Sequence, residues 1–208
     1  MTKRCFGIAL CVAAVSLSGC ALTTEKIELQ YKQQQGFTQI PGASGVSVNV
    51  KVTDLRQDKS KVSVKKNGYG MEMAPIIATD DVAATLRKAI EDELRARGFQ
   101  FDADGALVRI AADLTRFYSD FKIGFFAGDA VADLNMAVTV VSKKGDSLYS
   151  RQIMVQGTEP NIQLASGENA KAALDKALAN GVRVLVEDRA FLSALMSTSP
   201  RTAAARKR

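Results

Sequence analysis

The alternation of hydrophobic and polar residues marks the strands of one folded region. Residues 46–53 place a valine at every second position between polar side chains, which is the period of a half-buried strand. Val62 and Val64 alternate more weakly among lysines and end at the turn pair Asn67-Gly68, which predicts a short edge strand. Residues 108–114 and 132–140 also alternate and predict two more strands, and a hairpin loop at Lys143-Lys144-Gly145-Asp146 leads into a further strand over residues 148–157.

Two longer segments repeat hydrophobic side chains every three or four residues, which predicts amphipathic helices. The first follows the acidic residues Asp80 and Asp81 and ends before Gly98, which suits a left-handed residue after a helix. The second begins near Gly167, and we expect Asp188 to cap a short final helix after it. The hydrophobic stripes are Val82, Leu86, Ala89, Ile90 and Leu94 in the first helix and Ala170, Leu174, Leu178, Val182 and Leu185 in the second.

The order of these elements predicts an α+β fold. A strand and a helix are followed by three strands and a helix, with a short edge strand and a short C-terminal helix in addition. One-sided strands and amphipathic helices favour two layers, a mostly antiparallel sheet of about four strands with two helices on one face. We expect a single domain over residues 46–197, a flexible tether before it up to residue 45, and a basic disordered tail over residues 198–208.

The N-terminus has the pattern of a secretory signal peptide over residues 1–19. Lys3 and Arg4 precede a short hydrophobic run, which is shorter than the about 20 residues that a membrane-spanning helix needs. Leu17-Ser18-Gly19-Cys20 is a lipobox, in which cleavage falls between Gly19 and Cys20. We therefore expect the Cys20 thiol to carry a diacylglycerol, and stable anchoring needs more than one acyl chain.

The residue after Cys20 bears on which membrane holds the protein. Asp at this place commonly retains lipoproteins in the inner membrane of Gram-negative bacteria, whereas this chain has Ala21. We therefore expect a lipid anchor in the outer membrane, with the domain in the periplasm. Cys5 and Cys11 lie in the signal peptide, so the processed chain has neither a free thiol nor a disulfide.

The basic composition does not indicate a nucleic-acid-binding protein. Of the 28 Lys and Arg residues, six lie in the signal peptide or in the tail, and the remaining 22 match the 22 Asp and Glu residues. A nucleic-acid-binding surface needs cations clustered on the fold. We expect no nucleic-acid partner.

Several motifs occur in a characteristic order. They are the lipobox, a valine-rich strand leading into Asp54-Leu55-Arg56-Gln57-Asp58, a helix ending Leu94-Arg95-Ala96-Arg97-Gly98-Phe99, and a hairpin before a long C-terminal helix. In these motifs and their order the chain resembles the YajG family of bacterial outer-membrane lipoproteins. The resemblance covers most of the processed domain. The chain departs from the family in its aromatic-rich segment around residues 117–126 and in its basic tail.

The residue types needed for common catalytic and metal sites are scarce. The chain has 0 His, and its processed form has no thiol, which argues against zinc sites and against Ser-His and Cys-His nucleophiles. The Ser-x-x-Lys match Ser63-Val64-Lys65-Lys66 lies in a strand pattern, and Asp102-Ala103-Asp104-Gly105 is an incomplete calcium loop. We expect no enzymatic activity, no metal and no cofactor.

Two features are candidates for partner binding. Asp54 and Arg56 at the end of the first strand form either a partner-facing charge pair or an ion pair that fixes the strand exit. The second feature is an aromatic cluster beside Gly124 and Gly128, which either packs the end of the core or forms a partly exposed contact loop. Its members are Phe117, Tyr118, Phe121, Phe125 and Phe126, of which Phe121, Phe125 and Phe126 are the contact candidates.

These features predict a membrane-anchored envelope lipoprotein, a non-enzymatic accessory module that binds a protein partner. The alternative is a carrier of a small apolar or glycan-lipid ligand held between the sheet and the helices. A filled core would favour the first function, and a sizeable apolar cavity under the long helix would favour the second.

Overall fold

The computed structural model describes residues 22–36, 38–122, 124 and 127–198. These residues form eight strands, one short 3-10 helix and three α-helices. In chain order the elements are β1 (Glu25–Ile27), η2 (Ala43–Gly45), β2 (Ser47–Asp54), β3 (Ser63–Lys66), β4 (Glu72–Ala78), α2 (Val82–Ala96), β5 (Gln100–Phe101), β6 (Val108–Lys122), β7 (Gly128–Ser142), β8 (Ser147–Ile162), α3 (Gly167–Val186) and α4 (Arg189–Met196).

The larger sheet has five strands in the order β5-β2-β6-β7-β8. The long strands β6, β7 and β8 pair antiparallel through short connections, whereas β2 pairs with β6 in parallel. A parallel pair needs a long crossover connection, and here the crossover contains β3, β4, α2 and β5. The alternating valines of β2 therefore face the helices beside the buried residues of β6.

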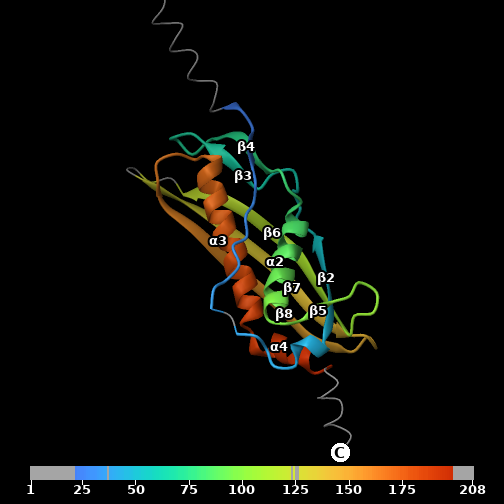
Figure 1. Cartoon of the computed structure of the whole chain (residues 1–208). Helices are drawn as coiled ribbons and strands as arrows, with labels where there is room; N and C mark the ends of the chain where they lie inside the picture. The colour runs from blue at the N-terminus through green and yellow to red at the C-terminus, as the bar shows by residue number, and fades with distance from the viewer. Residues whose placement is uncertain (1–21, 37, 123, 125–126, 199–208) are drawn as a thin grey trace, which may run out of the picture.

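A smaller sheet of three strands, in the order β1-β4-β3, continues the fold at one end (Figure 1). It joins the larger sheet beside the second half of β6. There the Ser119 amide donates to the Val62 carbonyl at 2.8 Å, and the Ser63 hydroxyl donates to the Ser119 carbonyl at 2.7 Å. These two bonds replace the pairing that β6 loses where β2 ends.

Helices α2 and α3 lie on the same face of the larger sheet, and α4 closes its far end (Figure 1). Each begins at a side chain that accepts a backbone amide of its first turn. Asp81 accepts from Ala84 at 3.0 Å, and Asp188 accepts from Ala190 at 2.8 Å. Such caps contribute about 0.5–2 kcal/mol each, which is why these positions set the helix starts.

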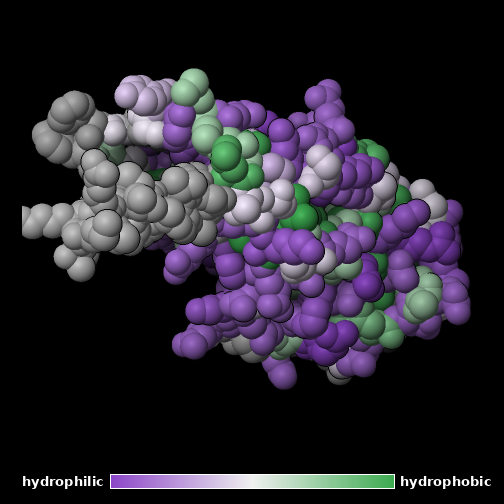
Figure 2. Space-filling view, turned by 90° about the horizontal axis from the view of Figure 1, so that it is seen from above, coloured by the Kyte–Doolittle hydropathy of each residue, from purple (hydrophilic) through white to green (hydrophobic). Residues whose placement is uncertain are grey.

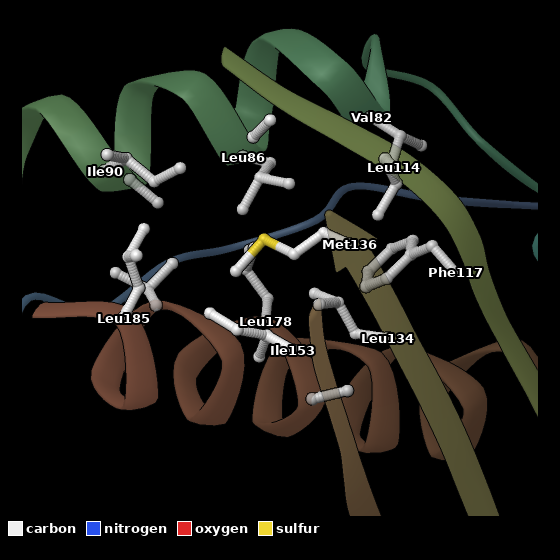
Figure 3. Close-up of a cluster of buried hydrophobic side chains, with 14 of the residues drawn as sticks. Val82, Leu86, Ile90, Leu114, Phe117, Leu134, Met136, Ile153, Leu178 and Leu185 are labelled. Atoms are coloured by element: carbon white, nitrogen blue, oxygen red, sulfur yellow. The ribbon is translucent and has the colours of Figure 1, made fainter. Parts of the chain in front are cut away.

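The core lies between the helices and the sheet. Figure 3 shows hydrophobic side chains of α2 and α3 pointing toward those of the central strands. Beneath the two helices these side chains meet so closely that the gap between them leaves no room for a water molecule. The residues around this gap are Leu29, Val82, Thr85, Leu86, Leu114, Phe117, Leu134 and Leu178.

The α+β class, the helices and the one-sided covering of the sheet confirm the fold expected from the sequence. The number of strands was underestimated, because β1, β4 and β5 carry little alternation. Strand β4 is the central strand of its sheet and contains Pro75, which has no amide for the ladder. A proline within a run argues against a central strand, so no local pattern predicts β4.

The flexible tether expected before residue 46 is wrong from Glu25 onward. Strand β1 pairs with β4, and the chain then runs between α2 and α3 (Figure 1, blue). We call residues 25–36 the N-terminal strap. Ile27 and Leu29 are buried in the core, each 6% exposed, and Gln30 donates its amide to Asp175 of α3 at 2.8 Å. The polar composition of these residues suggested a flexible tether, whereas the strap is held largely by hydrogen bonds. The boundary at residue 46 is therefore too late.

Candidate functional site

Asp54 and Arg56 form a tight ion pair where β2 ends. The Arg56 guanidinium donates to both carboxylate oxygens of Asp54, with the shortest distance 2.8 Å, and the Arg56 amide donates to the same carboxylate at 3.0 Å. Burial raises the pKa of Asp54, but the bonds and charge of Arg56 outweigh it and leave that pKa below its ordinary value.

The surroundings of Arg56 decide between the two interpretations of this pair. Arg56 is 7% exposed, and its second terminal nitrogen lies 3.5 Å from the Phe117 carbonyl of β6. The partner-facing interpretation is therefore wrong for Arg56, because its donors are used within the fold. The pair fixes the exit of β2, which is the alternative that the sequence left open.

The aromatic segment belongs mostly to the strands. Strand β6 has a bulge between Leu114 and Arg116, which shifts its alternation by one residue. Phe117 and Phe121 consequently point inward and are 2% and 3% exposed. The expectation that Phe121 forms a contact surface is wrong for this reason.

The other residues predicted as sites, in the β6–β7 connection and at the N-terminus, are not described by the structure. Phe125 and Phe126 lie outside the described residues, as do the signal peptide, Gly19 and Cys20. The first described residue is Leu22, and the first strand begins at Glu25. Strand pairing in the sheet therefore begins only a few residues after Cys20.

The outer edge of β8 is a feature that the sequence did not reveal. Among the strands of the described chain, β8 pairs only with β7 and so forms one border of the larger sheet. Its 16 residues are long for an edge strand, and Met154 in its middle is 71% exposed. Exposed edges of this kind are uncommon because unpaired main-chain groups invite another strand.

Helix α3 covers the second half of this edge. Asn180 donates its side-chain amide to the Gln156 carbonyl at 2.7 Å, and Lys176 donates to the Thr158 carbonyl at 2.9 Å. The close approach is possible because Gly157 has no side chain, and a Cβ there would overlap the main chain of Ala173 and Ala177. The carbonyls of Gln156 and Thr158 therefore point away from β7 and accept hydrogen bonds from side chains of α3.

Within the described residues, no strand pairs with the first half of the edge. The pairing of β7 with β8 is regular between Thr158 and Tyr149, so main-chain groups alternate in direction along this stretch. Since the carbonyls of Gln156 and Thr158 point outward, those of Ser150, Gln152 and Met154 point outward as well. We call these three residues the open edge. Their side chains lie on the sheet face opposite the helices, and all three are exposed.

Metal-ligand clusters and membrane-spanning helices are absent from the described chain. Within residues 22–36, 38–122, 124 and 127–198, no three His, Cys, Asp or Glu side chains gather as metal ligands. In the same part of the chain, no helix is long and apolar enough to cross a bilayer.

Comparison with known proteins gives a family and a fold. A family model described as uncharacterized lipoprotein matches residues 33–196. No curated protein matches the chain. The crystal structure of protein XCC0632 from Xanthomonas campestris is 14% identical, covers 88% of this chain and 98% of its own, and has a TM-score of 0.52.

A second solved structure, a putative lipoprotein from Caulobacter crescentus, is also 14% identical and covers 80% of this chain and 95% of its own, with a TM-score of 0.43. At these identities a structural likeness bears on the fold alone, and of these two structures only the first is similar enough to support it.

Proposed function

The chain belongs to this family of uncharacterized lipoproteins, and we propose that it is a lipid-anchored envelope protein that binds a protein partner without catalysing a reaction. The lipobox supports Cys20 as the anchored residue, and Ala21 supports the outer membrane as its location. Membership of the YajG family within this group is part of the proposal.

The packed strap supports a short distance between the proposed anchor and the domain. Only residues 21–24 separate Cys20 from β1. A fully extended chain rises at most about 3.6 Å per residue, so Glu25 can lie no more than about 18 Å along the chain from the lipidated cysteine. The domain would therefore stay beside the membrane surface.

The open edge of β8 is the observation that favours a protein partner. A partner's extended segment could pair with the outward main-chain groups of Ser150, Gln152 and Met154 and so add a strand to the sheet. Main-chain bonds supply the affinity in this mode of recognition, and side-chain contacts supply the specificity. The exposed Met154 side chain is suited to such a contact because methionine adapts to differently shaped partners.

The packing between sheet and helices favours partner binding over the carrier alternative. The space beneath α2 and α3 is filled by side chains from both layers (Figure 3) and leaves no room for a water molecule in the gap beside Leu134 and Leu178. An apolar ligand held there would need the helices to separate from the sheet.

A photo-crosslinking residue in place of Met154 tests the proposed function in intact cells. We expect it to yield a discrete adduct with an envelope protein. The matched control is the same residue at Leu55, which is also apolar and is 52% exposed but lies after β2. The Gln152→Pro change removes one outward amide without touching the β7 pairing, so it should weaken the adduct by roughly two- to tenfold. Equal adducts from both positions, or none from Met154, would contradict partner binding at this edge.

A further inference from the structure

Exposed apolar side chains gather at one end of the molecule. Among the described residues seven large apolar side chains are exposed, and only Leu55 and Met154 lie elsewhere. The other five are Leu22 (65% exposed), Tyr69 (91%), Met71 (59%), Met73 (36%) and Leu164 (73%). We call these five residues the apolar tip.

The fold brings the members of the apolar tip together from three separate segments. The β3–β4 loop and the β8–α3 loop line one pocket of about 340 Å³, which includes Asn67 and Leu164. The start of the chain joins them through Glu25, which accepts the backbone amide of Gly167 at the start of α3 and pairs with Lys65 of β3 at 2.7 Å. Figure 2 looks down on this end and shows apolar residues among the polar ones on its surface.

The β3–β4 loop is organised so that its apolar side chains stay exposed. The side-chain oxygen of Asn67 accepts the backbone amides of Tyr69 and Met71, both at 3.0 Å. Gly70 between them has a positive φ of 80°, which glycine adopts without strain. The loop therefore holds Tyr69 and Met71 in a defined turn in which both side chains are exposed.

We propose that the apolar tip docks into the interface of the lipid bilayer that holds the anchor. This inference rests on the proposed lipidation of Cys20. Leu22 belongs to the tip and is only two residues from Cys20, so the anchored cysteine and the tip face the same membrane. Tyr69 is suited to this environment, because an aromatic ring with a polar hydroxyl partitions to the boundary of headgroups and acyl chains.

The charges around the tip indicate an apolar contact that does not depend on anionic lipid. Lys65 is paired with Glu25, and Lys66 is paired with Asp120. The exposed Lys122 and Glu72 at this end carry opposite charges. A surface that is electrically balanced in this way gains little from a negatively charged bilayer, in contrast to a polybasic patch.

A tryptophan at position 69 provides a specific probe, because the chain contains no Trp. The full-length lipidated Tyr69→Trp protein is reconstituted into phosphatidylethanolamine and phosphatidylglycerol vesicles that contain brominated lipids. We expect its emission to shift to shorter wavelength and to lose about half its intensity, since interfacial side chains lie about 5–10 Å deep. The same result is expected at low and at high salt. The control is Met154→Trp, an exposed apolar position outside the tip, whose emission should be unaffected.

The mass of the N-terminal peptide from the same preparation separates two failures. If Cys20 carries its acyl chains but the Tyr69→Trp protein is no more quenched than the Met154→Trp protein, tip docking is overturned and the anchor stands. The same holds if quenching disappears at high salt, because the contact would then be electrostatic. If Cys20 carries no lipid, the proposed anchor fails and tip docking fails with it.

Discussion

Replacement of Glu93 by Ala is expected to destabilise the domain by about 3–5 kcal/mol, the usual cost of removing one partner from a buried ion pair. Glu93 lies in α2, is 0% exposed and pairs with Arg97 one turn later. Arg97 is itself only 7% exposed, so the variant would leave its charge with less compensation in a poorly solvated place.

The same carboxylate holds the N-terminal strap. It accepts the Tyr31 hydroxyl at 2.7 Å and the Gln34 amide at 2.8 Å. Burial and the neighbouring Glu93 raise the pKa of the Tyr31 hydroxyl, which keeps it protonated as a donor. We therefore expect Glu93→Ala both to lower the free energy of unfolding and to speed amide exchange in residues 28–36.

Denaturant unfolding with amide hydrogen exchange measures both effects. The matched control is Glu91→Ala on the same helix, because Glu91 forms an exposed pair with Arg87, whose side chain is 49% exposed. Exposed pairs contribute about 0.2–1 kcal/mol, so the control should change little. If Glu93→Ala costs no more than Glu91→Ala, the strap is not held as described.

Replacement of Gly157 by Ala should lower the free energy of unfolding more than a glycine-to-alanine change at an open position. The added Cβ would meet the main chain of Ala173, Lys176 and Ala177, and backbone atoms cannot move aside as a flexible side chain can. We expect a loss of about 3 kcal/mol, at the upper end of overpacking costs. For a domain of this size that corresponds to a fall in Tm of about 6–12 °C.

Thermal unfolding of Gly68→Ala is the control for this prediction. Gly68 lies in the β3–β4 loop, and a Cβ there would meet nothing within 4 Å. Its Tm should stay close to that of the unmodified protein. Equal Tm values for Gly157→Ala and Gly68→Ala would show that α3 does not pack closely against β8. The second half of the β8 edge would then also be uncovered.

The hydrophobic periodicity was sufficient to predict the elements that cover the core. The stripe of α2 and the cap at Asp188 are local signals, and the structure places them as expected, whereas Thr79, Asp80 and Asp81 were expected to supply the cap and first-turn acids of α2 together and only Asp81 caps the helix. The alternation of β6 could be recognised only up to Leu114, because a bulge after this residue interrupts it, and the sequence left open whether the strand continues or a loop follows. The pairing partner β7 continues past the bulge and extends β6 to Lys122, which no local pattern shows.

The strap and the open edge were hidden from the sequence for a different reason. The strap is polar, and its bonds reach residues about 60 or 145 positions away, such as Glu93 and Asp175. The edge position of β8 depends on the order of strands in the sheet, and the residues of β8 resemble those of a paired strand. Among the candidate sites, only the lipobox rests on a local motif, since its chemistry lies in four consecutive residues.

The mass of the N-terminal peptide of the processed protein tests the proposed anchor most directly. The lipobox predicts a peptide that begins at Cys20 and carries a diacylglycerol on the thiol, and it predicts that the Cys20→Ala protein remains an unprocessed, unlipidated precursor. A processed peptide that begins at another residue, a Cys20 without acyl chains, or a fatty-acid label that persists in the Cys20→Ala variant would contradict it.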